Sequence, residues 1–270
     1  MIGTETLEQL LKLIPYTGRI YDAEPVSTLL IAPPEHGKTE LIKKVKTAPN
    51  TVYLTDFTPF GLDEVVSDQI IENGVTHLLC PDMIRVFARR VTREALVTYL
   101  NGLTEEGIEL QLTYATLVKS QRKRNVGERY KAGIVIAITT AKNNQYYKLL
   151  SETGFYSRML KIRYKYSDET KQRIINSIVE KEKPREEPFT FNIPTDKVKV
   201  CIKPKQIAQL IPLFEEVNSD YAGVGARLLK HLIALTQAAA LEAGRKKVTQ
   251  ADIELILSFR EYLTFRGAEI

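Results

Sequence analysis

Residues 32–39, Ala-Pro-Pro-Glu-His-Gly-Lys-Thr, have the types and spacing of a loop that cradles phosphate groups. The apolar run before them, residues 27–31, is typical of a buried strand, and residues 40–45 are typical of a helix. In such a unit the backbone N–H groups of the loop and the helix N-terminus bind anions. Lys38 can then reach the β- and γ-phosphates, and the Thr39 hydroxyl can ligate Mg²⁺. The sequence therefore predicts a site for a nucleoside triphosphate.

The loop follows the pattern G-x-x-x-x-G-K-[ST], with Ala32 in place of the first glycine. This departure is mild, because the tightest backbone demand falls at Gly37, next to the lysine. His36 could contact phosphate, although a solvent-facing loop position is the plainer interpretation. The alternative for the whole motif is an accidental Gly-Lys-Thr. The residues expected to contact the nucleotide are Pro34, Glu35, His36, Gly37, Lys38, Thr39 and Glu40.

A phosphate loop needs an acid at the end of a neighbouring strand to hold Mg²⁺, usually through its water shell. Asp82 is the leading candidate, since it follows the predicted strand 75–80. Its alternative role is to cap the helix that comes next. Asp56, at the end of the predicted strand 51–55, is the weaker candidate. Thr39 and Asp82 are therefore the expected metal ligands.

The composition is that of a soluble globular protein, with 44% hydrophobic and 26% charged residues in a chain of 270. No apolar run approaches the length of a membrane span, and residues 1–5 do not resemble a signal peptide. Cys80 and Cys201 lie in apolar stretches far apart, so we expect two reduced core thiols. These features predict a cytoplasmic protein without a membrane partner.

Strand and helix patterns alternate along the first 166 residues, which predicts an α/β doubly wound parallel sheet with a phosphate loop. Expected strands are 27–31, 51–55, 75–80, 108–114, 133–139 and 158–164, the last range including the approach to its strand, and expected helices are 5–14, 62–71, 83–103 and 144–153. Helical patterns then follow at 168–182, with Ser167 as the expected cap, at 226–243, and at 250–264, with Thr249 and Asp252 as the expected capping pair. We therefore expect two domains, an α/β nucleotide-binding core at 1–166 and a small all-α lid at 167–270.

This layout resembles that of the AAA+ ATPases, a P-loop NTPase family in which a helical lid follows an α/β core. Pro33-Pro34 and Gly37-Lys38-Thr39 match the usual loop of that family. Residues 136–140 resemble its first-sensor strand, with Thr140 where the family usually has Asn. Gly154 to Arg158 resembles the segment that carries the arginine finger, and residues 225–229 resemble the second-sensor motif, with Arg227 as the sensor.

The resemblance implies an ATPase that assembles as a homo-oligomeric ring or spiral and binds ATP between subunits. The residues it implies for catalysis are Lys38, Asp82, Thr140, Arg158 and Arg227. One departure concerns hydrolysis, because the family normally has Glu directly after the acid that Asp82 matches. Met83 stands there in this chain. Slow hydrolysis, or an acid from elsewhere, is the expected consequence.

The stretch from Lys119 to Lys131 has a net charge of +5, as large as that of the whole chain. Its basic residues are Lys119, Arg122, Lys123, Arg124, Arg129 and Lys131. Residues 108–135 predict a strand, a basic loop and a strand. A solvated charged loop is one interpretation. The other is a hairpin that follows a phosphate backbone without reading sequence.

A hairpin at this point resembles the AAA+ branch with the minichromosome-maintenance helicases and the MoxR-like chaperones, in which it points into the ring pore. The resemblance implies DNA as a partner, single-stranded or duplex. It also implies a role in DNA replication as a minimal helicase, a helicase loader or a remodelling factor, with a helicase as a possible protein partner. The alternatives are a MoxR-like protein remodeller, whose hairpin grips polypeptide, and a nucleotide-gated scaffold with weak hydrolysis.

Overall fold

The computed structural model describes most of the chain, in eight stretches. These are residues 3–58, 61–62, 65–83, 87, 89–109, 129–180, 188–220 and 225–270. In the part of the chain so described, no helix is long and apolar enough to cross a membrane.

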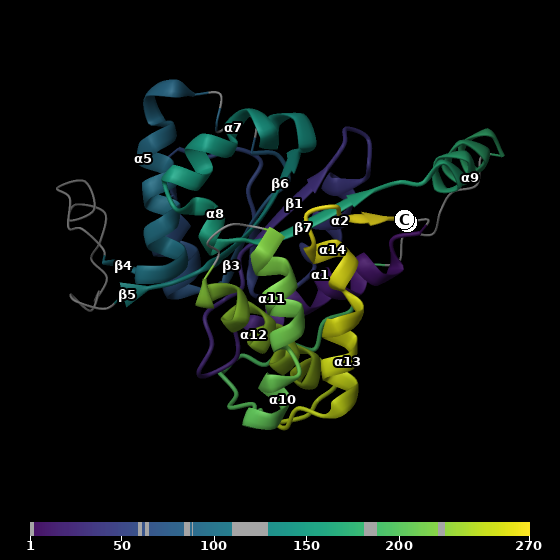
Figure 1. Ribbon diagram of the computed structural model, residues 1–270. Helices are drawn as coiled ribbons and strands as arrows, with labels where there is room; N and C mark the ends of the chain where they lie inside the picture. Colours follow the sequence, from purple (N-terminus) through teal and green to yellow (C-terminus); the bar gives the residue numbers. More distant parts are fainter. Residues whose placement is uncertain are drawn as a thin grey trace.

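A parallel sheet forms the centre of the molecule (Figure 1). Its strand order is β2-β3-β6-β1-β7-β8. The bounds are β1 (Thr28–Ala32), β2 (Thr51–Tyr53), β3 (His77–Cys80), β6 (Gly133–Thr139), β7 (Leu160–Lys165) and β8 (Ala268–Glu269). The near-continuous apolar runs of β1 and β6 are buried on both faces, as parallel strands usually are. The predicted α/β class with a parallel sheet is confirmed.

Helices cover both faces of this sheet. One face packs against α1 (Glu5–Thr17), α2 (Lys38–Val45) and α12 (Ala226–Glu242) in a single apolar cluster. The other face packs against α5 (Arg90–Asn101), α7 (Thr140–Glu152) and α8 (Phe155–Arg158). The π-helical segments η1 (Val66–Glu72) and η2 (Gly102–Glu106) border the second cluster. Side chains alternate between the two faces along each strand, which gives each layer its own core.

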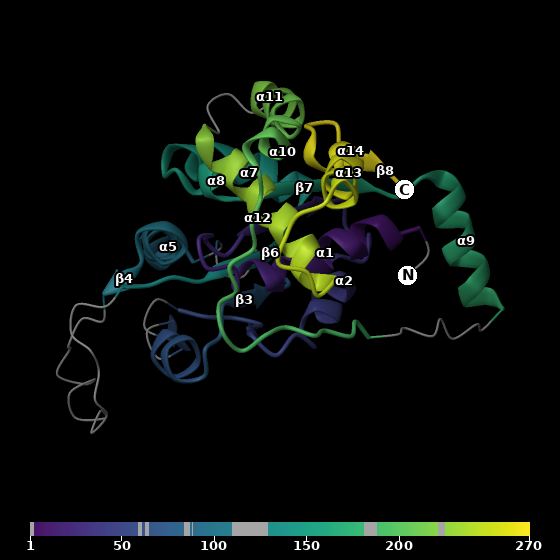
Figure 2. The ribbon, with the colours of Figure 1, turned by 90° about the horizontal axis from the view of Figure 1, so that it is seen from below.

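The C-terminal half contributes a helical layer that lies against α1 (Figures 1 and 2). It consists of α10 (Pro204–Ala208), α11 (Ile211–Asp220), α12, α13 (Gln250–Ser258) and α14 (Arg260–Leu263). Asp252 accepts a hydrogen bond from the Thr249 backbone N–H at 2.7 Å, which confirms the predicted cap of the last helical region. The prediction that residues 167–270 are all α-helical is wrong, because β8 pairs with β7 in the sheet.

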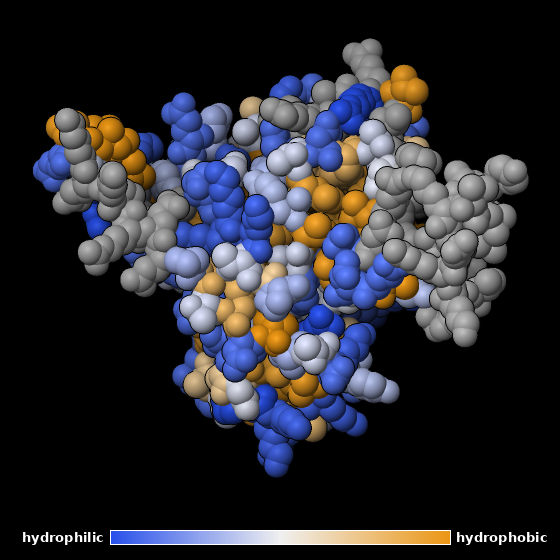
Figure 3. Space-filling model, turned by 180° about the vertical axis from the view of Figure 1, so that it is seen from behind, coloured by the Kyte–Doolittle hydropathy of each residue, from blue (hydrophilic) through white to orange (hydrophobic). Residues whose placement is uncertain are grey.

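The helix α9 (Asp168–Val179) extends away from the rest of the molecule (Figure 2). The Ser167 hydroxyl caps its N-terminus by accepting a hydrogen bond from the Thr170 N–H, as the sequence predicts. Its apolar side chains Ile175, Ile178 and Val179 are exposed. They form an apolar patch over α9 at the upper left of Figure 3.

Residues 158–164 are a strand and its approach, as predicted, since Arg158 closes the short helix α8 and β7 begins at Leu160. Two other local predictions are wrong. The first helix continues through Pro15 to Thr17 rather than ending at Pro15. Cys201 is exposed, whereas Cys80 is buried, because the segment around Cys201 contributes only one isolated bridge to Lys247 and leaves its side chain outside the core. Only one of the two expected core thiols therefore exists.

The predicted hairpin has its base in the described part of the chain. Ile108 pairs with Tyr130, and Glu109 pairs with Arg129, in an antiparallel arrangement. The strands so defined are β4 (Ile108–Glu109) and β5 (Arg129–Tyr130). The rest of the predicted hairpin, at 110–128, lies outside the described residues.

Candidate functional site

The loop between β1 and α2 is tightly curled. Gly37 precedes the first residue of α2 and has a φ of 68° and a ψ of 10°, in the left-handed region that favours glycine. Glu35 also has a positive φ of 62°, which is uncommon for a residue with a Cβ atom. This curl brings the loop directly onto the N-terminus of α2. Successive N–H groups at such a turn make an anion-binding concavity.

The location in the sheet also favours a ligand site. The chain leaves β1 for β2 at one border of the sheet, and it later crosses over β1 to reach β7. The strand order therefore reverses beside β1. Open α/β sheets bind ligands outside the carboxyl ends of their strands at such a reversal. We call the end of the sheet that holds Ala32, Cys80 and Thr139 the carboxyl edge, and the opposite end the amino edge.

The amine of Lys38 turns back onto its own loop. Its Nζ donates hydrogen bonds to the carbonyl oxygens of Ala32, at 2.9 Å, and Pro33, at 2.5 Å. Burial lowers the pKa of Lys38 to about 8, and the negative charge of Asp82 acts in the opposite direction. The carboxylate of Asp82 is therefore close enough to Lys38 to influence its charge.

The strand register explains why Lys38 and Asp82 share one edge. Ala32 at the end of β1 pairs with Thr139, and Cys80 at the end of β3 pairs with Ile136 of the same intervening strand. The loops that follow β1 and β3 thus leave the sheet on either side of β6. Asp82 belongs to the second of these loops, where the sequence predicts it.

Thr39 and Asp82 provide the hydroxyl and carboxylate oxygens that Mg²⁺ prefers. Thr39 lies in the first turn of α2 and is exposed, and Glu40 next to it accepts a hydrogen bond from Lys43 Nζ at 2.7 Å. Among the described residues, no group of three or more His, Cys, Asp or Glu side chains could hold a metal ion. The donor set thus fits a Mg²⁺ ion that takes most of its ligands from phosphate and water, as Mg²⁺ usually does.

Two tyrosines that the sequence did not single out hold the loop in place. The Tyr164 hydroxyl donates a 2.7 Å hydrogen bond to the His36 carbonyl oxygen, and the His36 ring stacks on Tyr166 with centroids 4.7 Å apart. Burial raises the pKa of Tyr166 to about 12, so its hydroxyl stays neutral at physiological pH. His36 is therefore a packing contact between the loop and the end of β7. The apolar and polar residues that alternate along β7 could have shown that Tyr164 lies in a strand. Its contact with His36 also depends on β7 lying next to β1 in the sheet.

Thr140 is at the carboxyl edge, one residue beyond β6. Thr139 caps α7, and its hydroxyl accepts from the Lys142 N–H at 3.4 Å. Because Thr139 pairs with Ala32, Thr140 follows the strand directly beside the phosphate loop. Its expected role toward the γ-phosphate remains a prediction.

Arg158 and Arg227 meet at the amino edge of the sheet. Arg158 comes just before β7 begins, whereas the loop of Lys38 follows the end of β1. The two edges are separated by the length of β1, about 13 Å at roughly 3.3 Å per residue. Arg227 Nη1 donates a 3.0 Å hydrogen bond to the Ser157 hydroxyl, which brings it to the same place. Within one chain the two arginines are therefore grouped with each other and not with Lys38.

Glu105 joins these two arginines. Its Oε2 lies 2.8 Å from Arg158 Nε, and its Oε1 accepts a 2.5 Å hydrogen bond from Arg227 Nε. The Arg227 Nη2 group also contacts Oε1. The sequence suggested no role for Glu105, because nothing placed it near either arginine.

The basic residues are only partly described. Lys119, Arg122, Lys123 and Arg124 lie outside the described residues. Arg129 is exposed in β5, and Lys131 forms a 2.7 Å ion pair with Glu24. The predicted nucleic-acid surface stays a prediction, and Lys131 has a structural partner.

No family model matches the chain, and no curated protein matches it either. The strongest feature of the site is a left-handed turn that delivers Lys38 to the carboxyl edge of a parallel sheet, the edge at which Asp82 also lies.

Proposed function

We propose that the protein is an ATPase of the P-loop class that binds ATP and Mg²⁺ on residues 34–40. One observation supports this most directly. Lys38 follows a left-handed glycine at the start of α2, and Asp82 follows the end of β3 at the same edge of the sheet. A lysine, a helix N-terminus and an acid at one sheet edge are the parts that position a triphosphate and its metal.

In this proposal each residue has a distinct role. Lys38 leaves its carbonyl partners and donates to the β- and γ-phosphates. When Mg²⁺ is bound, the Thr39 hydroxyl and the Asp82 carboxylate would be the residues that hold it. Thr140 faces the γ-phosphate and orients the attacking water. The metal neutralises charge on the phosphates while these side chains fix their positions.

Hydrolysis in this proposal is slow. The residue after Asp82 is Met83, whose side chain is fully buried in the apolar cluster of α5. The position directly after Asp82 in the sequence therefore provides no carboxylate to orient a water molecule. Proton transfer by a well-placed base typically contributes 10²–10⁴-fold to a rate.

The arginines support a site that a second copy completes. Arg158 and Arg227 lie at the amino edge, away from the loop of their own chain. In a homo-oligomeric ring or spiral, the amino edge of one copy faces the carboxyl edge of the next. Arginine suits this role because its planar group binds phosphate through paired hydrogen bonds.

DNA is the proposed substrate of the assembly, with the basic residues between β4 and β5 in the sequence as its contact. The net charge of residues 119–131 supports this, since basic loops bind phosphate backbones. The rival function is a MoxR-like remodeller of proteins, and a nucleotide-gated scaffold is the third. Steep salt dependence of DNA binding, lost when Arg122, Lys123 and Arg124 are replaced by Ala, would favour DNA.

Nucleotide binding tests the proposal. ATP with Mg²⁺ should bind the wild-type chain, and Lys38→Ala should abolish both binding and turnover. Lys43→Ala is the matched control, because Lys43 is an exposed lysine of the same helix that forms an ion pair with Glu40, three residues before it. Equal turnover in wild type and Lys38→Ala would overturn the proposal. Turnover measured with and without single-stranded DNA then separates the DNA role from the rivals.

A further inference from the structure

A cleft of about 280 Å³ lies between α12 and the amino edge of the sheet. Arg158, Arg227, Lys230 and His231 line it together with the acids Glu105, Asp22 and Glu24. It is separate from the phosphate loop, since residues 22–24 precede β1 and Arg158 precedes β7. The carboxylate of Glu105 forms ion pairs with both arginines of this cleft.

Each oxygen of Glu105 lies against a different arginine. Oε1 accepts a hydrogen bond from Arg227, and Oε2 forms an ion pair with Arg158, whose Nη1 donates to the Gly154 carbonyl oxygen. A phosphate also offers several oxygens and negative charge to guanidinium groups. The side chains of Glu105 and Arg158 retain only 25% and 15% of their exposure, so water weakens this ion pair less than it would on an open surface.

Glu105 is the carboxylate of the cleft that contacts its arginines. Arg158, Arg227 and Lys230 line the cleft with Asp22, Glu24 and Glu105, and Glu24 is paired with Lys131 outside this group. His231 adds no charge at neutral pH, because burial and the nearby Arg227 and Lys230 lower its pKa to about 4, against the opposing effect of Glu105. An anion therefore gains little from entering the cleft unless the carboxylate of Glu105 moves aside.

The backbone holds Glu105 in position. It belongs to η2 and is followed by Glu106 and then Gly107, whose N–H bonds to the Gly102 carbonyl oxygen at 2.8 Å. Gly107 has a φ of 80°, and a Cβ atom there would lie 2.8 Å from Arg129 Cβ. This turn leads directly into β4, so Glu105 is anchored next to the base of the hairpin.

We propose that Glu105 is a regulatory counter-ion, which keeps Arg158 and Arg227 from phosphate until the triphosphate bound to a second copy displaces it. The proposal rests on the proposed function, in which the amino edge of one copy meets the phosphate loop of the next. Glu105 thus makes the arginines available only in an assembled, nucleotide-loaded interface. It is a positioning residue, because it acts through the arginines and not on the nucleotide.

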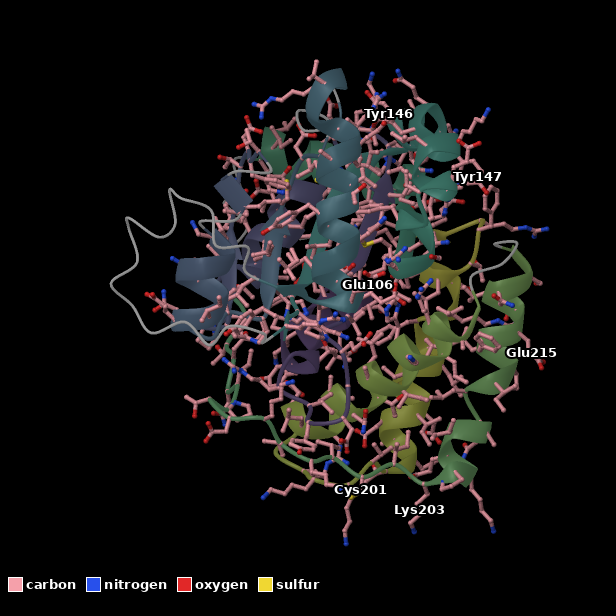
Figure 4. All side chains as sticks on the ribbon, turned by 90° about the vertical axis from the view of Figure 1, so that its left-hand side faces the viewer. Glu106, Tyr146, Tyr147, Cys201, Lys203 and Glu215 are labelled. Atoms are coloured by element: carbon pink, nitrogen blue, oxygen red, sulfur yellow. The ribbon has the colours of Figure 1, made fainter. Side chains whose placement is uncertain are left out.

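The test uses Glu105→Gln, which removes the charge but keeps a hydrogen-bond acceptor of the same shape. The matched control is Glu106→Gln, a change at the exposed neighbour of Glu105 (Figure 4). Both are made in the full chain carrying Lys38→Ala, so that the phosphate loop contributes little. The probe is inorganic tripolyphosphate, measured by calorimetry.

We expect Glu105→Gln to bind tripolyphosphate about tenfold more tightly than Glu106→Gln, the effect of removing one competing charge. Adding Arg227→Ala should abolish the gain. Equal affinities in the two variants, with both folded by circular dichroism, would overturn the proposal. If Glu105→Gln does not fold, Glu105→Ala replaces it, because it also removes the charge, and an affinity equal to that of Glu106→Gln would count against the proposal in the same way.

A second readout separates this inference from the proposed function. In the chain with an intact Lys38, Glu105→Gln should reach half-maximal ATP turnover at a lower protein concentration than wild type. Absence of turnover in every protein would contradict the proposed ATPase while leaving the tripolyphosphate result to decide on Glu105. An unchanged concentration dependence alongside normal turnover would contradict the counter-ion role alone.

Discussion

Burial changes the pKa of Lys38, the side chain that we propose binds the triphosphate. Two carbonyl oxygens, of Ala32 and Pro33, hold its amine in a partly desolvated position. Desolvation penalises the charged amine, so its pKa falls to about 8 even though Asp82 favours the charge. In the proposed complex, a triphosphate would reverse this balance, because it would supply negative charge directly to Nζ.

The first prediction at this scale is a pH dependence of nucleotide binding. Lys38 is mostly protonated at pH 7 and mostly neutral at pH 9, while the bound state requires the proton. Affinity for ATP with Mg²⁺ should therefore fall about tenfold between pH 7 and pH 9, with proton uptake on binding at the higher pH. Calorimetry in two buffers of different ionisation enthalpy measures both. Lys38→Arg, which stays charged, should show no such fall; an equal fall in both proteins would contradict the assignment.

The second residue-scale prediction concerns the two thiols. Burial raises the pKa of Cys80 to about 12, whereas Cys201 is exposed on the surface (Figure 4). A thiol reagent should modify one cysteine in the folded protein and two in denaturant, and mass mapping should place the fast site at Cys201. Fast reaction of Cys80 in the native protein would show that the packing around β3 differs from the structure described here.

At the scale of elements, the left-handed turn at Gly37 before α2 is expected to matter for both stability and nucleotide binding. Gly37→Ala forces a side chain into the left-handed region, which costs roughly 1 kcal/mol of folding free energy. Gly244→Ala is a suitable control, since Gly244 has a φ of 71° and nothing within 4 Å of its added Cβ. Both should lower the stability in urea by similar amounts, but only Gly37→Ala should weaken nucleotide binding. Equal binding by both variants would argue against the loop as the site.

The cap of α13 gives a second prediction at this scale. Burial opposes the charge of Asp252, but hydrogen bonds from Arg245 and Thr249 prevail and hold its pKa below the usual value. Asp252→Ala should therefore lower the free energy of unfolding by about 1–2 kcal/mol. The stability from this carboxylate is present above its unfolded pKa and is lost as the pH falls through its lower folded value. Glu254→Ala, an exposed change on the same helix, should cost much less in the same urea titration.

The sequence predicted elements well where periodicity was strong. The apolar runs of β1 and β6 and the caps of α9 and α13 are where the residues indicate them. β8 was missed because the two residues Ala268 and Glu269 are too short for any alternation. The predicted end of the first helix at Pro15 was wrong because the helix accommodates this proline. The Asn50 side chain donates a 2.8 Å hydrogen bond to the Pro15 carbonyl oxygen.

The site was only half predictable for a related reason. Lys38, Thr39 and Asp82 are each close to a strand end, so the rule that parallel strands share a carboxyl edge was enough to group them. The contacts of Tyr164 and Tyr166 with His36 require knowing that β7 is next to β1. The link between Glu105 and Arg227 spans 122 residues, and local patterns contain no information about such a contact.

For the whole molecule, the two edges of the sheet carry complementary halves of the proposed site. Lys38 and Asp82 are at the carboxyl edge, and Arg158 and Arg227 are at the amino edge. A single chain cannot bring these halves together, so head-to-tail association is the geometry that completes the site. ATP turnover should accordingly rise more steeply than linearly with protein concentration at low concentration, which a dilution series with a coupled assay measures.

The most direct test of this account mixes two inactive variants. Lys38→Ala lacks a functional phosphate loop and Arg158→Ala lacks the arginine, but a mixed interface contains one intact half from each. Random pairing in an equal mixture makes roughly a quarter of the interfaces complete. We predict that neither variant alone turns over ATP and that the mixture recovers about a quarter of the wild-type rate. A mixture no more active than its components, or full activity of Arg158→Ala alone, would contradict the shared site.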